Sequence, residues 1–435
     1  MEQAQVSTAL FEERIRTRTA KIGIIGLGYA GLPLAMAFAE AGFDVGGVDV
    51  DPERVDAVND RRSYLVDVPA EQYEQAEGAV TASTDYGVIG ELDAVTICVP
   101  TPLSKTRTPD ISYIVAAAES LAAELRPGQL IVLQSTTYPG TTEEIVLPIL
   151  ERSGGEVGSD FFLGYAPERV DPGNGHHTIR NTPKIIAGLT PPCRARTELL
   201  YGQIVDTLVP VSSPMVAETA KLHENTFRAV NIALANELAL MCDHLGVSVW
   251  EVIEAASTKP FGFLPHYPGP GLGGDCIPVV PHFLAWRLRE YGYSSRLIEV
   301  AHELNAQMPI YVVQKIADTL NDARLPIRGS RVLLLGLAYK ADVHDTRESP
   351  SLEVMRQLLA RGADVAYCDP WVDAVDLDGE RHLSREWSEG EVARADCVVL
   401  LTAHTAFLEH PLWEHAQRVV DTRNVVPTGP TVARL

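Results

Sequence analysis

Length, composition and charge set the first limits on this protein. The chain has 435 residues, of which 46% are hydrophobic and 22% charged, so we expect several packed domains. Its formal net charge of −22 argues against nucleic acid or an anionic membrane as a partner. The sequence contains no run of about 18 apolar residues and begins without the apolar core of a secretory signal, so it predicts neither a transmembrane helix nor export.

The cysteine pattern indicates the redox environment. The six cysteines are scattered and form neither a CxxC pair nor a metal-ligand spacing. This arrangement fits a reducing cytoplasm in which each thiol is either buried or reactive, so we expect a cytoplasmic protein without a metal site. The cysteines are Cys98, Cys193, Cys242, Cys276, Cys368 and Cys397.

The first strong pattern follows a polar, weakly amphipathic segment, residues 1–20, that we predict to be helical. Residues 21–25 form a short apolar strand that breaks into a glycine turn, and a helical pattern covers residues 32–41. A second strand, residues 43–50, carries Asp49 near its end. The order of strand, glycine turn, helix, strand and acid is typical of a dinucleotide-binding unit.

The glycine turn predicts how a dinucleotide would bind. Gly26 permits the tight turn, Gly28 lets the backbone approach the pyrophosphate, and Gly31 permits close packing of helix on strand. Asp49 lies 18 residues beyond Gly31, near the spacing at which a carboxylate meets a ribose 2′-hydroxyl, which favours NAD over NADP. An acid exposed at a strand end is the alternative. The predicted cofactor contacts in this unit are Gly26, Gly28, Tyr29, Ala30, Gly31 and Asp49, with the helix N-terminus facing the phosphates.

Strands and helices continue to alternate as far as about residue 195, where we expect the alternation to stop. Such alternation predicts a doubly wound parallel sheet. The expected strands are residues 93–99, 129–134 and 161–165, and the expected helices are residues 111–125 and 142–152.

Two of these strands end in polar loops, residues 99–102 and 134–140. Ligands of open α/β sheets bind outside the carboxyl ends of the strands, so we expect both loops to contact the cofactor. Helix capping and turn chemistry would explain the same residues without a ligand. The predicted contacts are Pro100, Thr101, Ser135 and Thr136.

The middle of the chain is predicted to be helical, beginning with a long stretch over residues 214–245. Lys221, Asn225 and, further along, Arg228 share one face of this helix. A polar stripe on a largely apolar helix either lies in solvent or faces a site, and both interpretations remain open. Further helices are expected over residues 281–291 and 296–321.

A stretch rich in glycine and proline, residues 261–278, presents a single cysteine, Cys276. Proline removes backbone donors and glycine costs backbone entropy, so this stretch is neither helix nor strand. A rigid loop ending in one thiol would bring backbone and sulfur close to a ligand. A structural turn with a buried cysteine is the alternative.

A second α/β unit begins with the strand and glycine turn of residues 331–340, which lacks the full GxGxxG pattern. We therefore predict an α/β fold with two doubly wound Rossmann-like domains joined by a central all-helical region, and two ligands facing each other across a cleft. The unit's other expected elements are a helix at 352–361 and strands at 364–367, 397–401 and 418–423. The predicted domains are residues 1–195, 196–310 and 311–435.

Six separated motifs stand out in this order. They are GLGYAGLPLA (26–35), QSTTYPGTTE (134–143), APERVDPGN (166–174), KLHEN (221–225), the loop before Cys276, and GLAYKADVHDTRESP (336–350). Together they resemble the UDP-glucose/GDP-mannose dehydrogenase family over nearly the whole chain. Within that family the likeness is closest to the bacterial UDP-N-acetylglucosamine and UDP-N-acetylmannosamine 6-dehydrogenases.

The resemblance implies a four-electron oxidation of a sugar C6 alcohol to a carboxylate with two NAD. Cys276 would trap the intermediate aldehyde as a thiohemiacetal, and a second oxidation would give a thioester that water hydrolyses. Lys221 would support the thiolate and the oxyanions, and Asn225 would steady the developing oxyanion. Glu168 would act as base for the water, with Thr136 helping to hold it.

The resemblance also implies the ligands and the assembly. The nucleotide of a UDP-sugar, with UDP-N-acetylglucosamine as the best candidate, would lie against the C-terminal domain. A homodimer built on the central helices is expected, and the sequence does not distinguish one hexosamine from another. The predicted substrate contacts are Glu168, Arg169, Lys221, Asn225, Phe261, Phe263, Gly273, Lys340 and Arg423.

Two positions depart from the family pattern. The family places an aspartate four residues after the cysteine, where this chain has Val280, which can neither accept a proton nor orient Lys221. Asp275 stands where the closest relatives carry histidine, and a carboxylate beside the thiol would disfavour the thiolate. Two alternatives follow: an incomplete or altered oxidation of another nucleotide sugar, and a nucleotide-sugar-binding protein without turnover.

Overall fold

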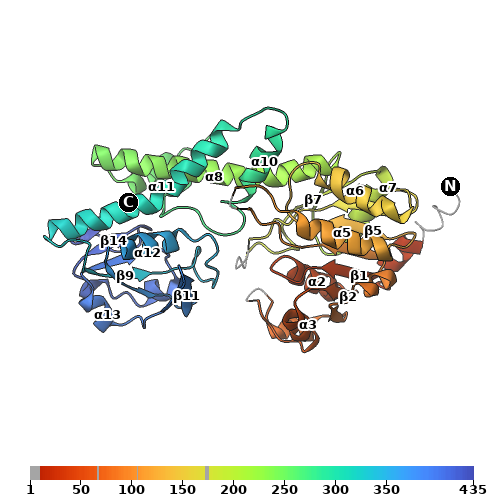
Figure 1. Ribbon diagram of the computed structural model, residues 1–435, viewed down its shortest axis with the longest axis horizontal. Helices are drawn as coiled ribbons and strands as arrows, with labels where there is room; N and C mark the ends of the chain where they lie inside the picture. The colour runs from red at the N-terminus through yellow and green to blue at the C-terminus, as the bar shows by residue number, and fades with distance from the viewer. Residues whose placement is uncertain (1–9, 66–67, 105, 172–175) are drawn as a thin grey trace. The chain divides into compact units, whose positions relative to one another are not determined.

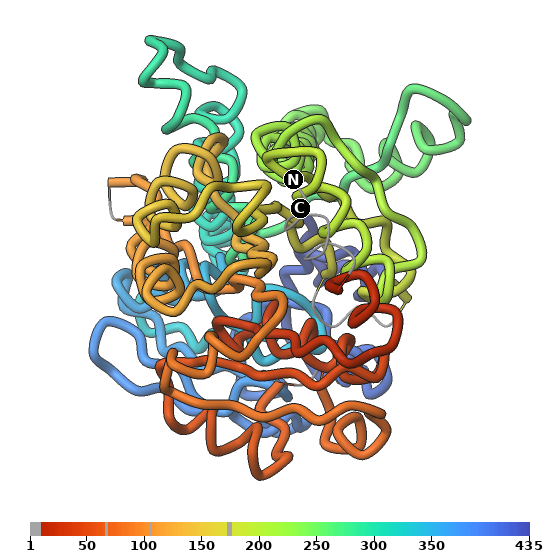
Figure 2. The backbone as a smooth tube through the Cα atoms, turned by 90° about the vertical axis from the view of Figure 1, so that its right-hand side faces the viewer, coloured from red at the N-terminus to blue at the C-terminus, as the bar shows by residue number. Residues whose placement is uncertain are grey.

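A computed structural model describes residues 10–65, 68–104, 106–171 and 176–435 of the chain. These residues form two compact units: unit 1 is Met1–Glu224 with His282–Tyr293, and unit 2 is Asn225–Pro281 with Ser294–Leu435. The course of the backbone through both units can be followed by colour in Figure 2. Of the helix expected over residues 1–20, residues 10–16 are helical, while residues 1–9 lie outside the described part.

Unit 1 is built on an eight-stranded sheet in the order β3-β2-β1-β4-β5-β6-β7-β8. Neighbouring strands are parallel except β6 and β7, which pair antiparallel. The predicted strands are confirmed, but the expectation that the alternation stops near residue 195 is wrong, because β7, α7 (Pro191–Tyr201) and β8 follow β6. The strands are β1 (Lys21–Ile25), β2 (Asp44–Val48), β3 (Val80–Ser83), β4 (Ala94–Ile97), β5 (Leu130–Leu133), β6 (Phe162–Tyr165), β7 (Lys184–Gly188) and β8 (Leu208–Pro210).

Helices cover both faces of this sheet (Figure 1). Side chains of α2 and α7 share one buried cluster with the strands, and those of α5 and α6 share another. The predicted helix over residues 142–152 is a π-helical turn at Thr142–Val146, then α6, then a 3₁₀ turn at Glu151–Ser153. The helices of this unit besides α7 are α2 (Gly31–Glu40), α3 (Pro52–Asn59), α4 (Ala70–Gln75), α5 (Ser112–Glu124) and α6 (Leu147–Leu150), with a 3₁₀ segment at Tyr86–Glu91.

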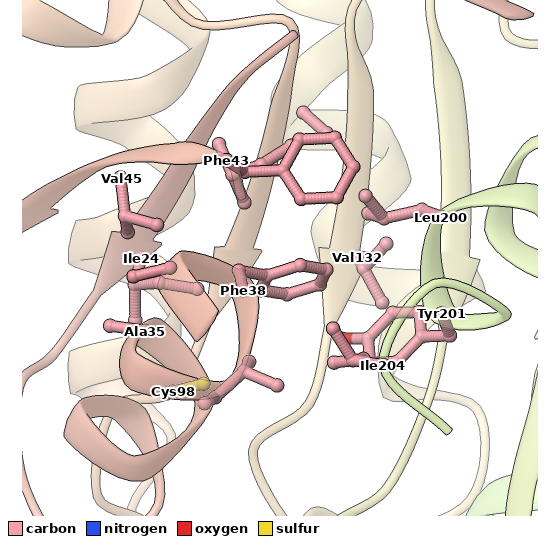
Figure 3. Packing of buried hydrophobic residues seen from close by; sticks show 14 of the residues in the cluster. Ile24, Ala35, Phe38, Phe43, Val45, Cys98, Val132, Leu200, Tyr201 and Ile204 are labelled. Carbon is pink, nitrogen blue, oxygen red and sulfur yellow. The ribbon is translucent and has the colours of Figure 1, made fainter. Parts of the chain in front are cut away.

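The first of these clusters joins α2, the helix that follows the glycine turn, to α7 and to strands that come later in the chain. Figure 3 shows Phe38 of α2 among side chains that include Tyr201 of α7. The ring centroids of Phe38 and Tyr201 lie 6.0 Å apart, and those of Phe38 and Phe43 lie 6.1 Å apart, both edge to face. Aromatic contacts of this kind add to the burial of apolar area, so they help to fix the C-terminal half of α2 on the sheet.

Unit 2 combines long helices with a five-stranded parallel sheet in the order β10-β9-β13-β14-β15. Side chains of α11 and α12 share one buried cluster with the strands, and those of α13 and α14 share another. The strands are β9 (Arg331–Leu335), β10 (Asp364–Cys368), β13 (Cys397–Leu400), β14 (Val419–Asp421) and β15 (Val432–Arg434), with a hairpin of β11 (Ala374–Leu377) and β12 (Glu380–Leu383). The helices are α8 (Pro214–Leu245, which begins in unit 1), α9 (Val249–Ser257), α11 (Arg296–Asp322), α12 (Pro350–Ala360), α13 (Glu389–Arg394) and α14 (Thr405–Glu409), with a 3₁₀ turn at Trp413–His415.

Helix α9 was not expected from periodicity, although its start carries a recognisable signal. The Ser248 side chain accepts a hydrogen bond from the backbone N–H of Glu251, which is the first half of a capping box. The two units together confirm the α/β fold class with two Rossmann-like sheets and a long central helix. None of the described helices combines the length and apolar character needed to cross a membrane.

Candidate active site

The glycine turn of unit 1 lies where the strand order of its sheet reverses. β1 is flanked by β2 and β4, so the chain leaves β1 beside the crevice in which open α/β sheets bind ligands. Gly26 has a φ of +91°, and a Cβ atom there would meet the carbonyl oxygen of Cys98 at 2.7 Å. At Gly31 a Cβ would lie 1.7 Å from the carbonyl oxygen of Gly26. Both positions therefore require glycine for backbone reasons.

This turn leaves space for a dinucleotide beside the N-terminus of a helix. A Cβ on Gly28 would meet the Arg54 guanidinium at 3.9 Å and nothing closer. Helix α2 begins after Ala30 without a side-chain cap, and its Leu32 N–H donates to the Gly28 carbonyl oxygen at 3.0 Å, so the helix macrodipole, with its positive end at the turn, is what favours a phosphate there. Tyr29 is 38% exposed in this turn. These features fit the pyrophosphate of NAD.

Asp49 is 5% exposed, so the alternative of a solvent-exposed strand-end acid is wrong. Its carboxylate accepts hydrogen bonds from the backbone N–H groups of Leu27 and Asp51. Sequence reasoning missed Arg54, whose guanidinium lies 3.5 Å from Asp49 and 3.4 Å from Asp51. Arg54 is one turn into α3, five residues beyond Asp49, and this spacing could have identified it.

We expect Gly31→Ala to weaken NAD binding by about 5- to 150-fold, because the added methyl group overlaps the Gly26 carbonyl and overpacking costs about 1–3 kcal/mol. Isothermal titration with NAD measures the change. Gly390→Ala is the matched control, since a Cβ there meets nothing within 4 Å. Equal NAD affinity in the Gly31→Ala variant and the control would contradict this role of the turn.

The two polar loops predicted to contact the cofactor lie together. Thr101 donates its hydroxyl hydrogen bond to the carbonyl oxygen of Thr136 at 2.6 Å. The Ser135 hydroxyl donates to the carbonyl oxygen of Val99 at 2.8 Å. The loops follow the adjacent strands β4 and β5, so the parallel pairing brings them side by side at the carboxyl edge, with Pro100 between their contact points.

Glu168 lies just beyond β6 at the same edge and is held by four donors. One carboxylate oxygen accepts the backbone N–H groups of Arg169 and Val170, at 2.8 and 2.9 Å. The other accepts the side chains of Gln134 at 2.9 Å and Lys184 at 3.1 Å. Burial alone would raise the pKa of Glu168, but the Lys184 charge and these hydrogen bonds outweigh it, so the pKa lies below its ordinary value.

The predicted substrate residue Arg169 is itself in an ion pair. Its guanidinium contacts Glu224 at 2.6 Å and donates to the carbonyl oxygen of Pro183 at 2.6 Å. Of the motif over residues 166–174, residues 172–174 lie outside the described part of the chain.

The polar stripe of α8 is buried where it carries the predicted catalytic residues. Lys221 is 8% exposed and Asn225 is 6% exposed, whereas Arg228 is exposed, so the solvent interpretation is wrong for the first two. The amide nitrogen of Asn225 has no hydrogen-bond partner among the described residues. A buried donor left unpaired costs about 1–3 kcal/mol, which a ligand oxygen would offset.

Glu218, one turn before Lys221, makes buried contacts that the sequence pattern did not reveal. Its fully buried carboxylate accepts hydrogen bonds from the backbone N–H groups of Gly140 and Thr142 and from the Thr142 hydroxyl, at 2.6–2.9 Å. Burial raises the pKa of Glu218 despite these donors. It ties α8 to the loop that carries Thr136.

In unit 2 the glycine- and proline-rich loop packs against the carboxyl edge of the second sheet. A Cβ on Gly269 would meet the Arg423 guanidinium at 2.8 Å, and the Gly269 N–H donates to the Asn236 side chain at 2.9 Å. A Cβ on Gly273 would meet the Tyr339 side chain at 2.6 Å. The structure thus brings this loop, which contains Gly273, close to Arg423 and to the segment that contains Lys340. Phe261 and Phe263 are 71% and 42% exposed at the start of the loop.

Cys276 follows this loop and is exposed, so the alternative of a buried structural cysteine is wrong. Its carbonyl oxygen accepts the N–H of Val280, the first residue of α10 (Val280–Arg289), at 2.8 Å. Cys276 therefore lies in the turn that leads into α10.

The two departures from the family pattern differ in their surroundings. The Asp275 carboxylate pairs with the Arg347 guanidinium, which also pairs with Asp345, so Asp275 is not an uncompensated anion beside the thiol. Both partners of the Asp275–Arg347 pair are about half exposed, and such a pair contributes little to stability. Val280 is 3% exposed and supplies no polar group.

The predicted catalytic set is divided between the two units. Thr136, Glu168 and Lys221 belong to unit 1, and Asn225 and Cys276 belong to unit 2. The boundary falls within α8, between Glu224 and Asn225.

Comparisons with known proteins agree along the chain. Three domain models of the UDP-glucose/GDP-mannose dehydrogenase family match it: the NAD binding domain at residues 20–205, the central domain at residues 215–307 and the UDP binding domain at residues 333–428. The chain is 34% identical over 389 residues to a UDP-N-acetyl-D-glucosamine 6-dehydrogenase of Pseudomonas aeruginosa, covering 89% of this chain and 91% of the relative. It is 36% identical over 419 residues to an NDP-N-acetyl-D-galactosaminuronic acid dehydrogenase of Ralstonia solanacearum, covering 93% and 96%.

A solved structure supports the same assignment. The UDP-D-ManNAc dehydrogenase of Pyrococcus horikoshii superposes with a TM-score of 0.87 at 31% identity, covering 95% of this chain and 98% of that protein. With the glycine turn, the buried Asp49 and the second Rossmann-like sheet already described, this chain belongs to the UDP-glucose/GDP-mannose dehydrogenase family and is an NAD-dependent nucleotide-sugar oxidoreductase.

Proposed function

We propose that this protein oxidises the C6 primary alcohol of a UDP-N-acetylhexosamine, with UDP-N-acetylglucosamine as the leading candidate, to the uronic acid through a covalent bond to Cys276. The observation that carries the proposal is the position of this thiol. Cys276 is the exposed cysteine among the described residues, whereas the other five are buried. It follows a loop packed on the sheet edge of the region that matches a UDP binding domain.

The geometry of unit 1 supports the proposed cofactor residues. NAD would lie across the glycine turn, with Asp49 and Arg54 at its ribose end and the loops of Thr101 and Ser135 along the carboxyl edge. When bound, NAD accepts a hydride from the sugar carbon in each of two oxidations. This arrangement leaves the chain's own residues to hold the sugar and to move protons.

The residues of the candidate site have distinct roles in this scheme. After the first oxidation the Cys276 sulfur adds to the aldehyde carbon, and Lys221 and Asn225 donate hydrogen bonds to the developing oxyanion. After the second oxidation a water attacks the thioester carbon and Glu168 takes its proton. The carbon–sulfur bond then breaks, which releases the carboxylate and returns the thiolate, and Thr136 helps to hold the water.

The names of the relatives support an N-acetylated hexosamine as the sugar. The proteins compared above act on UDP-N-acetylglucosamine, on an N-acetylgalactosaminuronic acid nucleotide or on UDP-ManNAc. The remaining predicted substrate contacts are Arg169, Phe261, Phe263, Gly273, Lys340 and Arg423.

We also propose a cytoplasmic homodimer with three domains, for which the sequence predicted 1–195, 196–310 and 311–435; the first boundary moves past β8, because α7 and β8 belong to the first sheet unit. The central helices support the dimer, because they expose large apolar side chains that a monomer would leave in water. Leu234, Met241 and Leu245 of α8 are 61%, 48% and 74% exposed. The scattered free thiols support the compartment.

A substrate panel tests the proposal. Purified protein is supplied with NAD and, in turn, UDP-GlcNAc, UDP-ManNAc, UDP-GalNAc and UDP-glucose, and the NADH formed per sugar is measured together with the product mass. We expect two NADH per UDP-GlcNAc and a uronic acid product. An NADH yield near zero with every UDP-hexosamine would overturn the proposal in favour of a nucleotide-sugar-binding protein without turnover.

One alternative is favoured by a specific observation. Because Val280 is buried and apolar where the family carries an aspartate, oxidation could stop at the aldehyde or act on another nucleotide sugar. The same panel distinguishes this outcome, since a stalled reaction gives one NADH per sugar and an aldehyde mass. A uronic acid as the sole product would remove this alternative.

A further inference from the structure

We infer that Lys184 is a positioning residue for the hydrolytic step: its buried ammonium keeps the Glu168 carboxylate ionised and oriented, and so sets the acid limit of activity. The inference rests on the proposed role of Glu168 as the base for the attacking water. Neither residue 184 nor its segment belongs to the motifs recognised in the sequence.

The sheet topology creates this contact. β7 runs antiparallel to β6, with Gly164 opposite Gly188 and Tyr165 opposite Ala187. The same register carried past the end of β6 places residue 168 opposite residue 184. Lys184, the first residue of β7, therefore lies at the carboxyl edge of β6, where its Nζ is 3.1 Å from a Glu168 oxygen.

The ammonium is buried and donates hydrogen bonds to two acceptors. The Lys184 side chain is 4% exposed, and that of Glu168 is 19% exposed. The Nζ also donates to the Gln134 side-chain oxygen at 3.2 Å and lies 5.4 Å from the centre of the Tyr201 ring. Gln134 in turn donates to Glu168 and accepts the Tyr201 hydroxyl at 2.9 Å. Burying a lysine at this depth is costly unless a carboxylate pairs with it, so the network is built around the Lys184–Glu168 ion pair.

The network has a direct consequence for a base. Lys184 and Gln134 occupy one oxygen of Glu168, and the two backbone N–H groups occupy the other, so the carboxylate cannot rotate freely. Other titratable groups that face it are Tyr201 of α7 and Cys98 after β4. Arg169 and Glu224 nearby compensate each other. Lys184 is therefore the cation that keeps Glu168 charged.

The sign of the pH effect follows from the pKa of Glu168, which is lowered in the folded protein. A lowered carboxyl pKa contributes stability above the unfolded pKa, and this stability is lost as pH falls through the folded pKa. Without Lys184, we expect the effect of burial to outweigh the two backbone donors and to raise the pKa of Glu168. As pH rises, ionisation of the buried Glu168 carboxylate would then destabilise the fold. Glu168 would also stay protonated up to a higher pH, so it would act as a base only above that pH.

The test compares Lys184→Met with Lys184→Arg, which keeps the charge, and with Tyr201→Phe, a control that removes the outer hydroxyl only. We expect Lys184→Met to move the acid limb of the kcat/KM profile for uronic acid formation upward by at least about one pH unit. Lys184→Arg and Tyr201→Phe should keep the limb within a few tenths of a unit of the wild type. A Lys184→Met rate lowered by the same factor at every pH would overturn the inference.

A second measurement works without turnover. The free energy of unfolding is measured by urea denaturation from pH 5 to pH 8 in two pairs of proteins. The first pair is Lys184→Met and the double variant Lys184→Met/Glu168→Gln, and the second pair is the wild type and Glu168→Gln. We expect Lys184→Met to lose stability relative to its double variant as pH rises, and the wild type to show no such loss relative to Glu168→Gln. If the unfolding free energies of both pairs change in parallel with pH, the inference is overturned. If they diverge but the substrate panel gives no NADH, only the proposed function is overturned.

Discussion

Cys276→Ser should lower the rate of uronic acid formation by at least about 10³-fold, the largest effect that we expect from any single substitution. The sulfur forms the covalent bond that carries the sugar between the two oxidations, and a hydroxyl at this position is a far weaker nucleophile near neutral pH. The exposed position of Cys276 in the turn that leads into α10 means that the change removes chemistry rather than core packing. NAD affinity should stay as in the wild type, because the glycine turn lies in unit 1.

The measurement combines NADH yield with mass spectrometry of the sugar product. Cys242→Ser in α8 is the control, because this cysteine is buried, lies outside the candidate site and is expected to change stability more than turnover. Iodoacetamide should label Cys276 before the buried thiols in the wild type, with loss of activity in parallel. Uronic acid formed by Cys276→Ser at a rate close to that of the wild type would refute the covalent mechanism.

Val280→Asp is expected to raise the rate of complete oxidation, by up to about 10²-fold, while lowering stability. A positioned acid or base contributes about 10²–10⁴-fold to a proton-transfer step, and Val280 supplies none. Val280 is 3% exposed, so a carboxylate there costs several kcal/mol unless a cation pairs with it. Folded domains have about 5–15 kcal/mol of stability, so we expect a folded variant with a lower melting temperature.

The matched control for this variant is Val280→Asn, which has a similar shape and polarity but cannot accept a proton. Initial rates of the second oxidation and of thioester hydrolysis, with melting curves for all three proteins, separate the catalytic effect from the cost in stability. Equal turnover in the wild type and Val280→Asp would show that Val280 does not limit the reaction. Equal turnover in the Asp and Asn variants, both above that of the wild type, would show that polarity rather than proton transfer is responsible.

Sequence patterns predicted the local features of the site well. The glycine turn depends on backbone geometry within a few residues, and Gly26 and Gly31 show the steric need that the pattern implied. Parallel strand pairs follow from alternating elements, so the contact between the loops of Thr101 and Thr136 was also predictable. Arg54 was missed, although its place one turn into the helix after Asp49 is a local signal.

Contacts between distant segments were not predictable in this way. Sequence reasoning ended the first sheet near residue 195 and so left out β8. It also left out β7, because no sequence period marks a strand that pairs antiparallel within an otherwise parallel sheet. Both strands are short enough to resemble loops in the sequence. Lys184 was therefore not seen as the partner of Glu168. The same limit applies to Arg347 beside Asp275 and to Glu218 beside Gly140, since each pair joins residues more than 70 positions apart.

The sequence by itself determined the fold class, the dinucleotide turn and the identity of the loop cysteine, because each depends on residue types at short, regular spacing. Only the tertiary structure decided which charges those residues meet. It paired Asp275 with an arginine, buried Val280, and placed a lysine against the predicted base. The physical reason is that ion pairs and burial depend on strand order and register, which no local pattern encodes.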